Sequence, residues 1–184
     1  GEFVQGARLR NRSRKSVENV PIPAIGAVYA LSDHEKDQFV RNEIELERYA
    51  GSLKGAEETL RQRRGNDVDQ ASLLVALFRA SGMPCRYVHG VIEQSVAELG
   101  YELGLSVPTP IAELLSRSGV PAKPVVRGGR VDAFQLEQTW VAAYAPYSNY
   151  RGAVVDVSGK TWIPLAPAFR RFERTPATAV LQAM

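Results

Sequence analysis

The sequence predicts an α+β fold in which one central buried helix packs against an antiparallel β-sheet. Two observations lead to this prediction. Residues 67–81 are apolar on nearly every side and carry start and stop signals for a helix. The stretches 85–92, 133–145 and 160–165 are rich in β-forming residues and are bounded by turn residues. With 184 residues, the chain is long enough for one domain with a real core.

The elements before the central helix are predicted from capping residues and chain breakers. Residues 1–31 form a basic N-terminal arm and lead-in, in which the segment NVPIPAIG contains two prolines and a glycine. Ser32 or Asp33 caps a helix that we expect to continue to about Arg48. A second, short helix is predicted over 54–63, after Gly51 and Ser52.

The central helix is the clearest element of the sequence. Asn66 or Asp67 can accept the free backbone N–H groups at its start, and Gly82 followed by Pro84 ends it. The segment CRYVHGVI then predicts a strand with Cys85 and His89 on one face and the alternate residues on the other.

The segment 93–130 is predicted to be a helical insert. Ser95 and Glu98 have the spacing of a capping box, and a second short helix is expected from Thr109-Pro110 to Gly119. Residues 121–132 are expected to form a loop or an irregular strand. Strands over 133–145, about 152–158 and 160–165 should then form an antiparallel meander, followed by a C-terminal tail over 171–184.

Charge and composition exclude several classes of protein. Five of the positive charges lie in the segment RLRNRSRKS, so the net charge of +3 becomes −2 without them. This arm lacks interleaved aromatic residues, so we expect a solvated or inter-domain linker and no nucleic-acid partner. No apolar run reaches the ~20 residues that a membrane span needs. One cysteine and two scattered histidines predict no internal disulfide, no metal site and no cofactor.

Four segments together resemble the transglutaminase-like superfamily, over about residues 38–169. GNDVDQASLLVALFRASGMPCRYVHG resembles its central helix and following strand, except that the cysteine at the helix start is missing. FVRNEIELERYAGSLKGAEETLRQRRG resembles the lead-in to that helix. LEQTWVAAYAPYSNYRG resembles the strand that carries the family's histidine, and GKTWIPLAPAF resembles its closing W-x-P-L-D-P strand. The resemblance implies a papain-like core.

Carried over position by position, the resemblance places the nucleophile at Asp67, the general base at Gln138 and the orienting acid at Ala166. A carboxylate is a poor nucleophile toward an amide, and a glutamine amide does not titrate near neutral pH. An alanine methyl group cannot orient a base. The resemblance therefore implies that the family's Cys–His–Asp chemistry is absent.

Non-catalytic roles are expected for these residues. Asp67 is expected to cap the helix, and Gln138 to share a strand face with Trp140 and to hydrogen-bond Asp67. Ala166 is expected to pack. The expected binding cleft consists of Asp67, Asp69, Gln138, Trp140, Tyr147 and Tyr150.

Two functions remain open from the sequence. The first is a catalytically inactive domain that binds a peptide or protein segment, including one from its own polypeptide, or that has a structural role. We expect its parent to be a larger multidomain bacterial protein, secreted or at the cell surface, because the chain begins and ends abruptly. The alternative is an active hydrolase, protease or acyltransferase with aspartate-based chemistry at Asp67 and Asp69.

Overall fold

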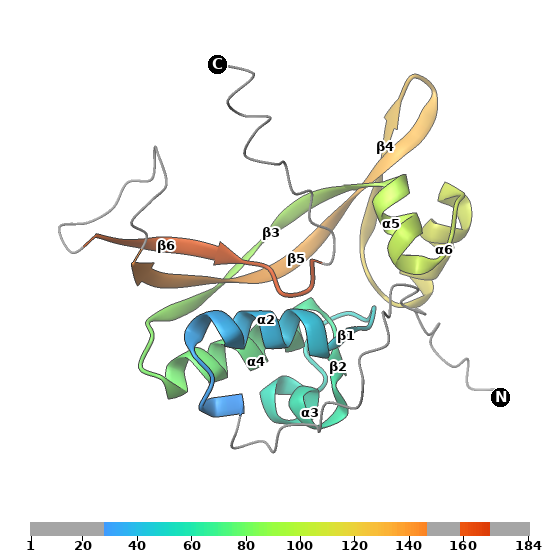
Figure 1. Ribbon diagram of the computed structural model, residues 1–184. Helices are drawn as coiled ribbons and strands as arrows, with labels where there is room; N and C mark the ends of the chain where they lie inside the picture. Colours follow the sequence, from blue (N-terminus) through green and yellow to red (C-terminus); the bar gives the residue numbers. More distant parts are fainter. Residues whose placement is uncertain (1–27, 147–158, 170–184) are drawn as a thin grey trace, which may run out of the picture.

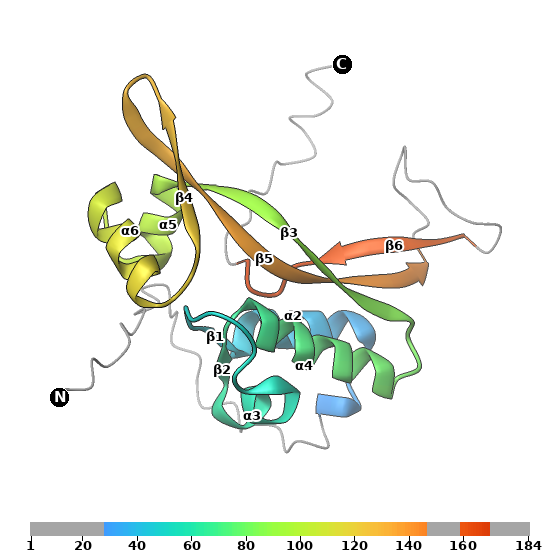
Figure 2. The ribbon, with the colours of Figure 1, turned by 180° about the vertical axis from the view of Figure 1, so that it is seen from behind.

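The computed structural model describes residues 28–146 and 159–169, and its centre is a four-stranded sheet (Figure 1). The strand order is β3-β5-β4, and β6 pairs with β5 on the same side as β4. All of these pairings are antiparallel. Two groups of helices lie at opposite ends of the long strands, as the views from the front and from behind both show (Figures 1 and 2). The α+β class and the antiparallel sheet are as predicted.

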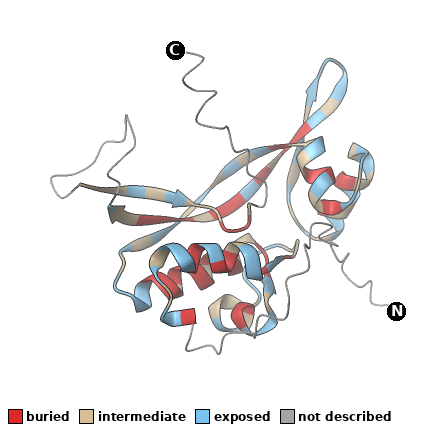
Figure 3. Ribbon diagram, viewed as in Figure 1, coloured by how far each residue is buried: buried red, intermediate tan, exposed pale blue. Residues whose placement is uncertain are grey.

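The central helix is α4, Asp67–Ala80, and it is buried as the sequence predicts. Its apolar residues form the first hydrophobic cluster together with Val141 and Ala143 of the sheet. Two further helices, α2 (Asp33–Glu43) and α3 (Gly55–Gln62), pack around α4. Figure 3 shows the buried residues concentrated on the faces of α2 and α4 that point toward each other and the sheet.

The partners of β5 change along its length. Strand β3 (Cys85–Ser95) pairs with β5 (Arg130–Pro146) over all eleven of its residues. On the opposite side, β4 (Ala122–Arg127) reaches only Leu136, and β6 (Lys160–Leu165) begins opposite Val141. Residues 137–140 therefore have no strand partner on that side among the described residues. We call this segment the unpaired stretch of β5.

A second hydrophobic cluster lies at the other end of the sheet, on its other face. Helices α5 (Val96–Leu103) and α6 (Pro108–Arg117) pack there against Phe134 and Leu136. Because side chains alternate along a strand, these even-numbered residues of β5 point away from the face that contacts α4. The capping box of Ser95 and Glu98 is present at the start of α5, as predicted.

Two expectations about the elements need correction. Helix α2 ends at Glu43, not near Arg48, because residues 45–46 form strand β1 (Glu45–Leu46). This strand pairs in parallel with β2 (Arg64–Gly65). Of the two alternatives for 121–132, the irregular strand is the correct one: β4 pairs with the start of β5 in a hairpin whose register shifts between Val125 and Val126. The insert also starts later than expected, because β3 continues to Ser95. The strand expected at 152–158 and its turn at Ser158 lie outside the described residues.

In the described part of the chain, no helix is both long enough and apolar enough to cross a membrane.

Candidate functional site

The start of α4 is capped by Asn66, whose side-chain Oδ1 accepts the backbone N–H of Asp69 at 2.9 Å. The amide of Asn66 also donates to the carbonyl oxygens of Tyr49 and Gly51, at 2.9 and 2.7 Å. Asp67 is thus the first helical residue. The expectation that Asp67 itself caps the helix is corrected, although its position still favours a negative charge next to the helix dipole.

The carboxylate of Asp67 accepts a hydrogen bond from the backbone N–H of Thr139, with an N–Oδ2 distance of 2.6 Å. Thr139 lies in the unpaired stretch of β5, where neither β4 nor β6 can accept this N–H group. A buried backbone donor without an acceptor is costly, and Thr139 is 8% exposed. Asp67 therefore satisfies a donor that the sheet leaves unpaired.

Gln138 lies directly before Thr139 and is buried, with 7% exposure. Neighbouring residues of a strand point to opposite faces, so the Gln138 side chain points away from α4 and shares its face with Trp140. Among the described residues, none hydrogen-bonds the Gln138 amide. The hydrogen bond of Asp67 is made with the next residue's backbone rather than with Gln138.

Ala166 directly follows the last residue of β6, Leu165, which pairs with Val141 at the end of the unpaired stretch of β5. Its carbonyl oxygen accepts the N–H of Phe169 at 3.0 Å, which closes a turn directly after β6. The Asp67–Thr139 hydrogen bond and the pairing of β6 with β5 thus place the backbones of residues 67, 138 and 166 in one region, although the Gln138 side chain lies on the sheet face away from α4. We call these three residues the triad positions.

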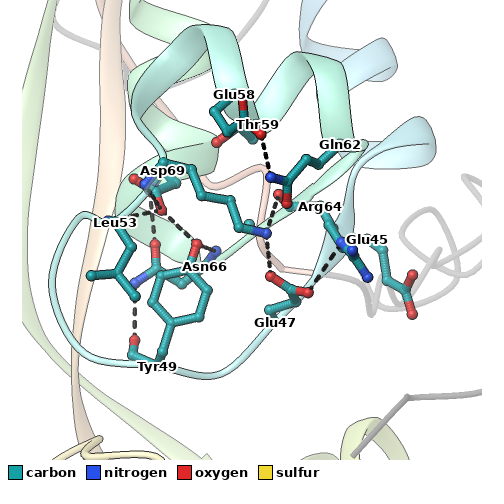
Figure 4. Close-up of polar contacts among 12 residues, drawn as sticks. Glu45, Glu47, Tyr49, Leu53, Glu58, Thr59, Gln62, Arg64, Asn66 and Asp69 are labelled. Carbon is teal, nitrogen blue, oxygen red and sulfur yellow. Dashed lines mark hydrogen bonds and ion pairs between the residues drawn. The ribbon is translucent and has the colours of Figure 1, made fainter. Parts of the chain in front are cut away.

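Asp69, two residues after Asp67, has no exposed surface and binds the loop that leads into α3 (Figure 4). Its carboxylate accepts from the Tyr49 hydroxyl at 2.5 Å and from the Ser52 hydroxyl at 2.7 Å. It also accepts the backbone N–H groups of Leu53, Lys54 and Gly55, at 3.2, 3.1 and 3.0 Å. With five donors around it, the carboxylate fixes this loop to the start of α4, which gives Asp69 a structural position.

The environment of Asp69 sets its ionisation. Burial raises the pKa of Asp69, but the hydrogen bonds from Tyr49, Ser52 and the backbone favour the charged form and bring the pKa below its ordinary value. Burial and the bond to Asp69 raise the pKa of Tyr49, so its hydroxyl stays a donor. The carboxylate is therefore held ionised, in an arrangement suited to holding a loop rather than to transferring protons.

Aromatic side chains cover the sheet face that carries Gln138. Trp140 is half-buried against Gly90, where an added Cβ would lie 2.9 Å from the Trp140 ring. Trp162 is 40% exposed, and its ring centroid lies 5.3 Å from that of Tyr144. The guanidinium carbon of Arg86 lies 4.3 Å from the Trp162 centroid. Tyr147 and Tyr150, expected in the cleft, lie outside the described residues.

The single cysteine has a packing position. Cys85 contacts the first hydrophobic cluster, and its Sγ lies 3.7 Å from the carbonyl oxygen of Val75 in α4. Burial raises the pKa of the Cys85 thiol, which disfavours the reactive thiolate. His89 instead contacts Thr139 Oγ1 at 3.1 Å and Glu137 at 3.7 Å. Within the described ranges, no group of three or more His, Cys, Asp or Glu residues is placed to hold a metal ion.

A surface cavity of about 620 Å³ lies between α5 and the start of β5, and its lining includes Tyr101 and Asp132. It is at the other end of the sheet from the triad positions, so it does not belong to that site.

The model of the transglutaminase-like superfamily matches residues 23–167, most of the chain. The chain belongs to this superfamily, and its α+β fold with an antiparallel sheet is consistent with that membership. No curated protein and no solved structure shows a significant match.

The functional groups at the triad positions limit what this site can do chemically. The site contains one carboxylate engaged with a backbone donor, one buried primary amide and one methyl group. No thiol or imidazole is present at these positions. A thiolate–imidazolium pair, which would attack a carbonyl carbon, cannot form from these groups.

The residues that organise the start of α4 were not predicted from the sequence. Tyr49 and Ser52 bind Asp69 across 20 and 17 residues of sequence. One feature of the sequence could have pointed to this contact: the loop around Gly51 is polar, and the first turn of α4 is acidic. Only the pairing of β1 with β2 brings this loop to α4, and that contact is not encoded locally.

Proposed function

We propose that this domain is a catalytically inactive member of the transglutaminase-like superfamily, which serves as a peptide-binding, protein-binding or structural module. The observation that carries the proposal is the hydrogen bond between the Asp67 carboxylate and the Thr139 N–H group. At the position of the family's nucleophile, the side chain closes a gap in the sheet's hydrogen bonding instead of facing a substrate.

The substitutions at the other two triad positions support the same proposal. Gln138 cannot accept a proton near neutral pH, and Ala166 cannot orient a base. The strand that bears Gln138, β5, is nevertheless paired with β6, and Ala166 directly follows β6. A domain that keeps the family's fold without a thiol and an imidazole at these positions is suited to binding or to a structural role, and not to catalysis.

We further propose that the bound partner is an extended peptide or protein segment, including one from the same polypeptide. The surface that favours it is the rim of the unpaired stretch of β5, with Trp140 beside it. A half-buried indole offers a large apolar contact and one N–H donor. In this proposal, the domain is part of a larger multidomain bacterial protein that is secreted or at the cell surface.

The binding proposal is tested with a displayed library of extended peptides selected against the purified chain. We expect enriched peptides to bind wild type at least about tenfold more tightly than Trp140→Ala. The matched control is Val126→Ala, which removes a 62% exposed apolar side chain from β4 and should leave binding unchanged. Circular dichroism shows whether each variant keeps the fold. Enriched peptides that bind both variants equally would place binding elsewhere and contradict this site.

The proposed lack of catalysis is tested separately with casein, a glutamine donor and an amine. We expect no deamidation, crosslinking or cleavage above the background of heat-denatured protein. Product formation that disappears in Asp67→Ala would support the aspartate-based enzyme instead.

A further inference from the structure

The outer edge of β3 has no strand partner among the described residues. Strand β3 pairs with β5 over eleven residues without a register shift, and it lies at the end of the strand order. Natural proteins protect such edges with charged side chains, proline, bulges or covering elements. β3 contains no proline, no lysine and no bulge, and its charged residues, Arg86 and Glu93, lie toward its ends. A long, regular edge of this kind is able to accept another strand.

The direction of the backbone groups follows from two hydrogen bonds of β5. Tyr144 donates its N–H toward the β3 side, to the carbonyl of Pro84 at 2.9 Å, whereas Thr139 donates away from β3 to Asp67. Even-numbered residues of β5 therefore bond to β3, and their partners in β3 are even-numbered too. The odd-numbered residues of β3 direct their N–H and C=O groups to the outer edge, among them Tyr87, His89 and Val91.

The side chains of these edge residues are also exposed. Tyr87 is 46% exposed and Val91 is 65% exposed, and both lie on the same face of β3, two residues on either side of His89. Tyr87 and Val91 lie at equal distances from His89. If two copies of β3 pair antiparallel around His89, the Tyr87 of each copy therefore lies opposite the Val91 of the other.

We propose that a second copy of this chain pairs with β3, antiparallel and edge to edge, on a two-fold axis at His89. In this register, Tyr87 of each copy lies opposite Val91 of the other copy. The two outward-facing His89 residues form the central hydrogen-bonded pair. Arg86 and Glu93 then lie opposite Ile92 and Cys85, so no like-charged carboxylates or guanidinium groups oppose each other. This inference does not depend on the proposed function.

The positions of the helices leave room for this pairing. Helix α4 packs on one face of the sheet near Cys85, and α5 packs on the other face beyond Gln94. The middle of β3, around His89, lies between these two groups. In the antiparallel dimer, α4 of the second copy lies near the end of the first copy's β3 that carries Val91 and Glu93. These two residues are exposed, on the same face that α4 covers near Cys85. The contact is short, so we expect a weak dimer that forms at high protein concentration.

Single-cysteine variants of the full chain test both the dimer and its register. In a Cys85→Ser background, His89→Cys places the two thiols opposite each other across the axis. Val91→Cys is the matched control, because in the same register its two copies are about 13 Å apart along the strand. Mild oxidation should link His89→Cys at least about tenfold faster than Val91→Cys. Val126→Cys, on exposed β4, reports random collision.

Analytical ultracentrifugation over a concentration series measures the dimer without crosslinking. Wild type should shift toward dimer as concentration rises, and Tyr87→Lys should remain monomeric while keeping its circular dichroism spectrum. Equal crosslinking at positions 89 and 91 would overturn the proposed pairing. A wild-type chain that stays monomeric throughout the series would also overturn it. This holds whether amide hydrogen exchange finds the β3 amides free or protected by another segment of the chain.

Discussion

Asp67 and Asp69 lie two positions apart in the first turn of α4, yet their carboxylates meet different surroundings. Asp67 is half-buried and accepts one backbone N–H from the sheet. Asp69 is fully buried and accepts five donors from the loop before α3. The first residue joins the helix to the sheet, and the second joins it to the loop. Their contributions to stability should therefore differ.

Replacing Asp69 with Asn should be strongly destabilising. An amide has one acceptor oxygen, and its NH₂ group would face backbone and hydroxyl donors in a buried site, so we expect a loss of about 3 kcal/mol in the free energy of unfolding. Urea denaturation measures this loss. The matched control is Asp132→Asn, whose exposed carboxylate pairs only with Arg127 among the described residues and should cost at most about 1 kcal/mol. Equal losses for the two variants would contradict the proposed role of Asp69.

The lowered pKa of Asp69 gives the stability a pH dependence of known sign. A carboxyl group whose pKa is lower in the folded state stabilises the protein above its unfolded-state pKa, about 3.9. This contribution is lost as the pH falls through the lower folded-state pKa. The difference in unfolding free energy between wild type and Asp69→Asn should therefore be constant above about pH 5 and shrink below about pH 4. Denaturation curves from pH 3 to pH 7 check this, and a difference that grows on acidification would refute it.

Asp67→Ala should have a smaller effect. The change leaves the Thr139 N–H without its acceptor, but the half-buried site admits water, so we expect a loss of about 1 kcal/mol. Asp67→Asn keeps an acceptor oxygen and should lose less. Amide hydrogen exchange gives a direct readout, because the Thr139 N–H should exchange faster in Asp67→Ala than in wild type. Unchanged protection would mean that another group holds this donor.

Among the elements, the central helix and the strand after it were predicted most accurately, because their signals are local. The capping side chain, the apolar faces and the terminating glycine of α4 all lie within or next to the helix. The end of α2 was predicted wrongly, because residues 45–46 leave the helix to pair with β2, about 20 residues later. An irregular strand was one of the two alternatives for 121–132, but its pairing with β5 was not predicted, because this pairing, with a register shift near Val125, depends on packing against α5 and α6.

The packing of α5 leads to a prediction about Gly100. A Cβ at this position would lie 2.3 Å from the backbone carbonyl oxygen of Leu105, and a backbone atom cannot move aside cheaply. Gly100→Ala should therefore cost about 3 kcal/mol, despite alanine's higher helix propensity. Gly104→Ala is a suitable comparison, since its site is open and only its φ of 69° is unfavourable, costing about 1 kcal/mol. Thermal unfolding of both variants tests this order, and the reverse order would contradict the close contact.

At the scale of the whole molecule, the sequence predicted the family, because the order of the motifs specifies it, whereas the hydrogen bond expected between Asp67 and Gln138 is made with the backbone of Thr139 instead. Membership in the transglutaminase-like superfamily is confirmed over residues 23–167. The role of Asp67 as an acceptor for Thr139 was not predictable. It depends on where β4 ends and β6 begins along β5, and this register is fixed by contacts distant in sequence. The location of two hydrophobic clusters on opposite faces of one sheet was missed for the same reason.

We propose that this chain keeps the fold of its superfamily without the reaction. The most direct measurement is mass spectrometry of casein and a glutamine donor peptide, incubated with an amine and the purified chain. We expect wild type and Asp67→Ala to give the same product level as substrate alone. Deamidated, crosslinked or cleaved product that wild type forms and Asp67→Ala does not form would contradict this proposal.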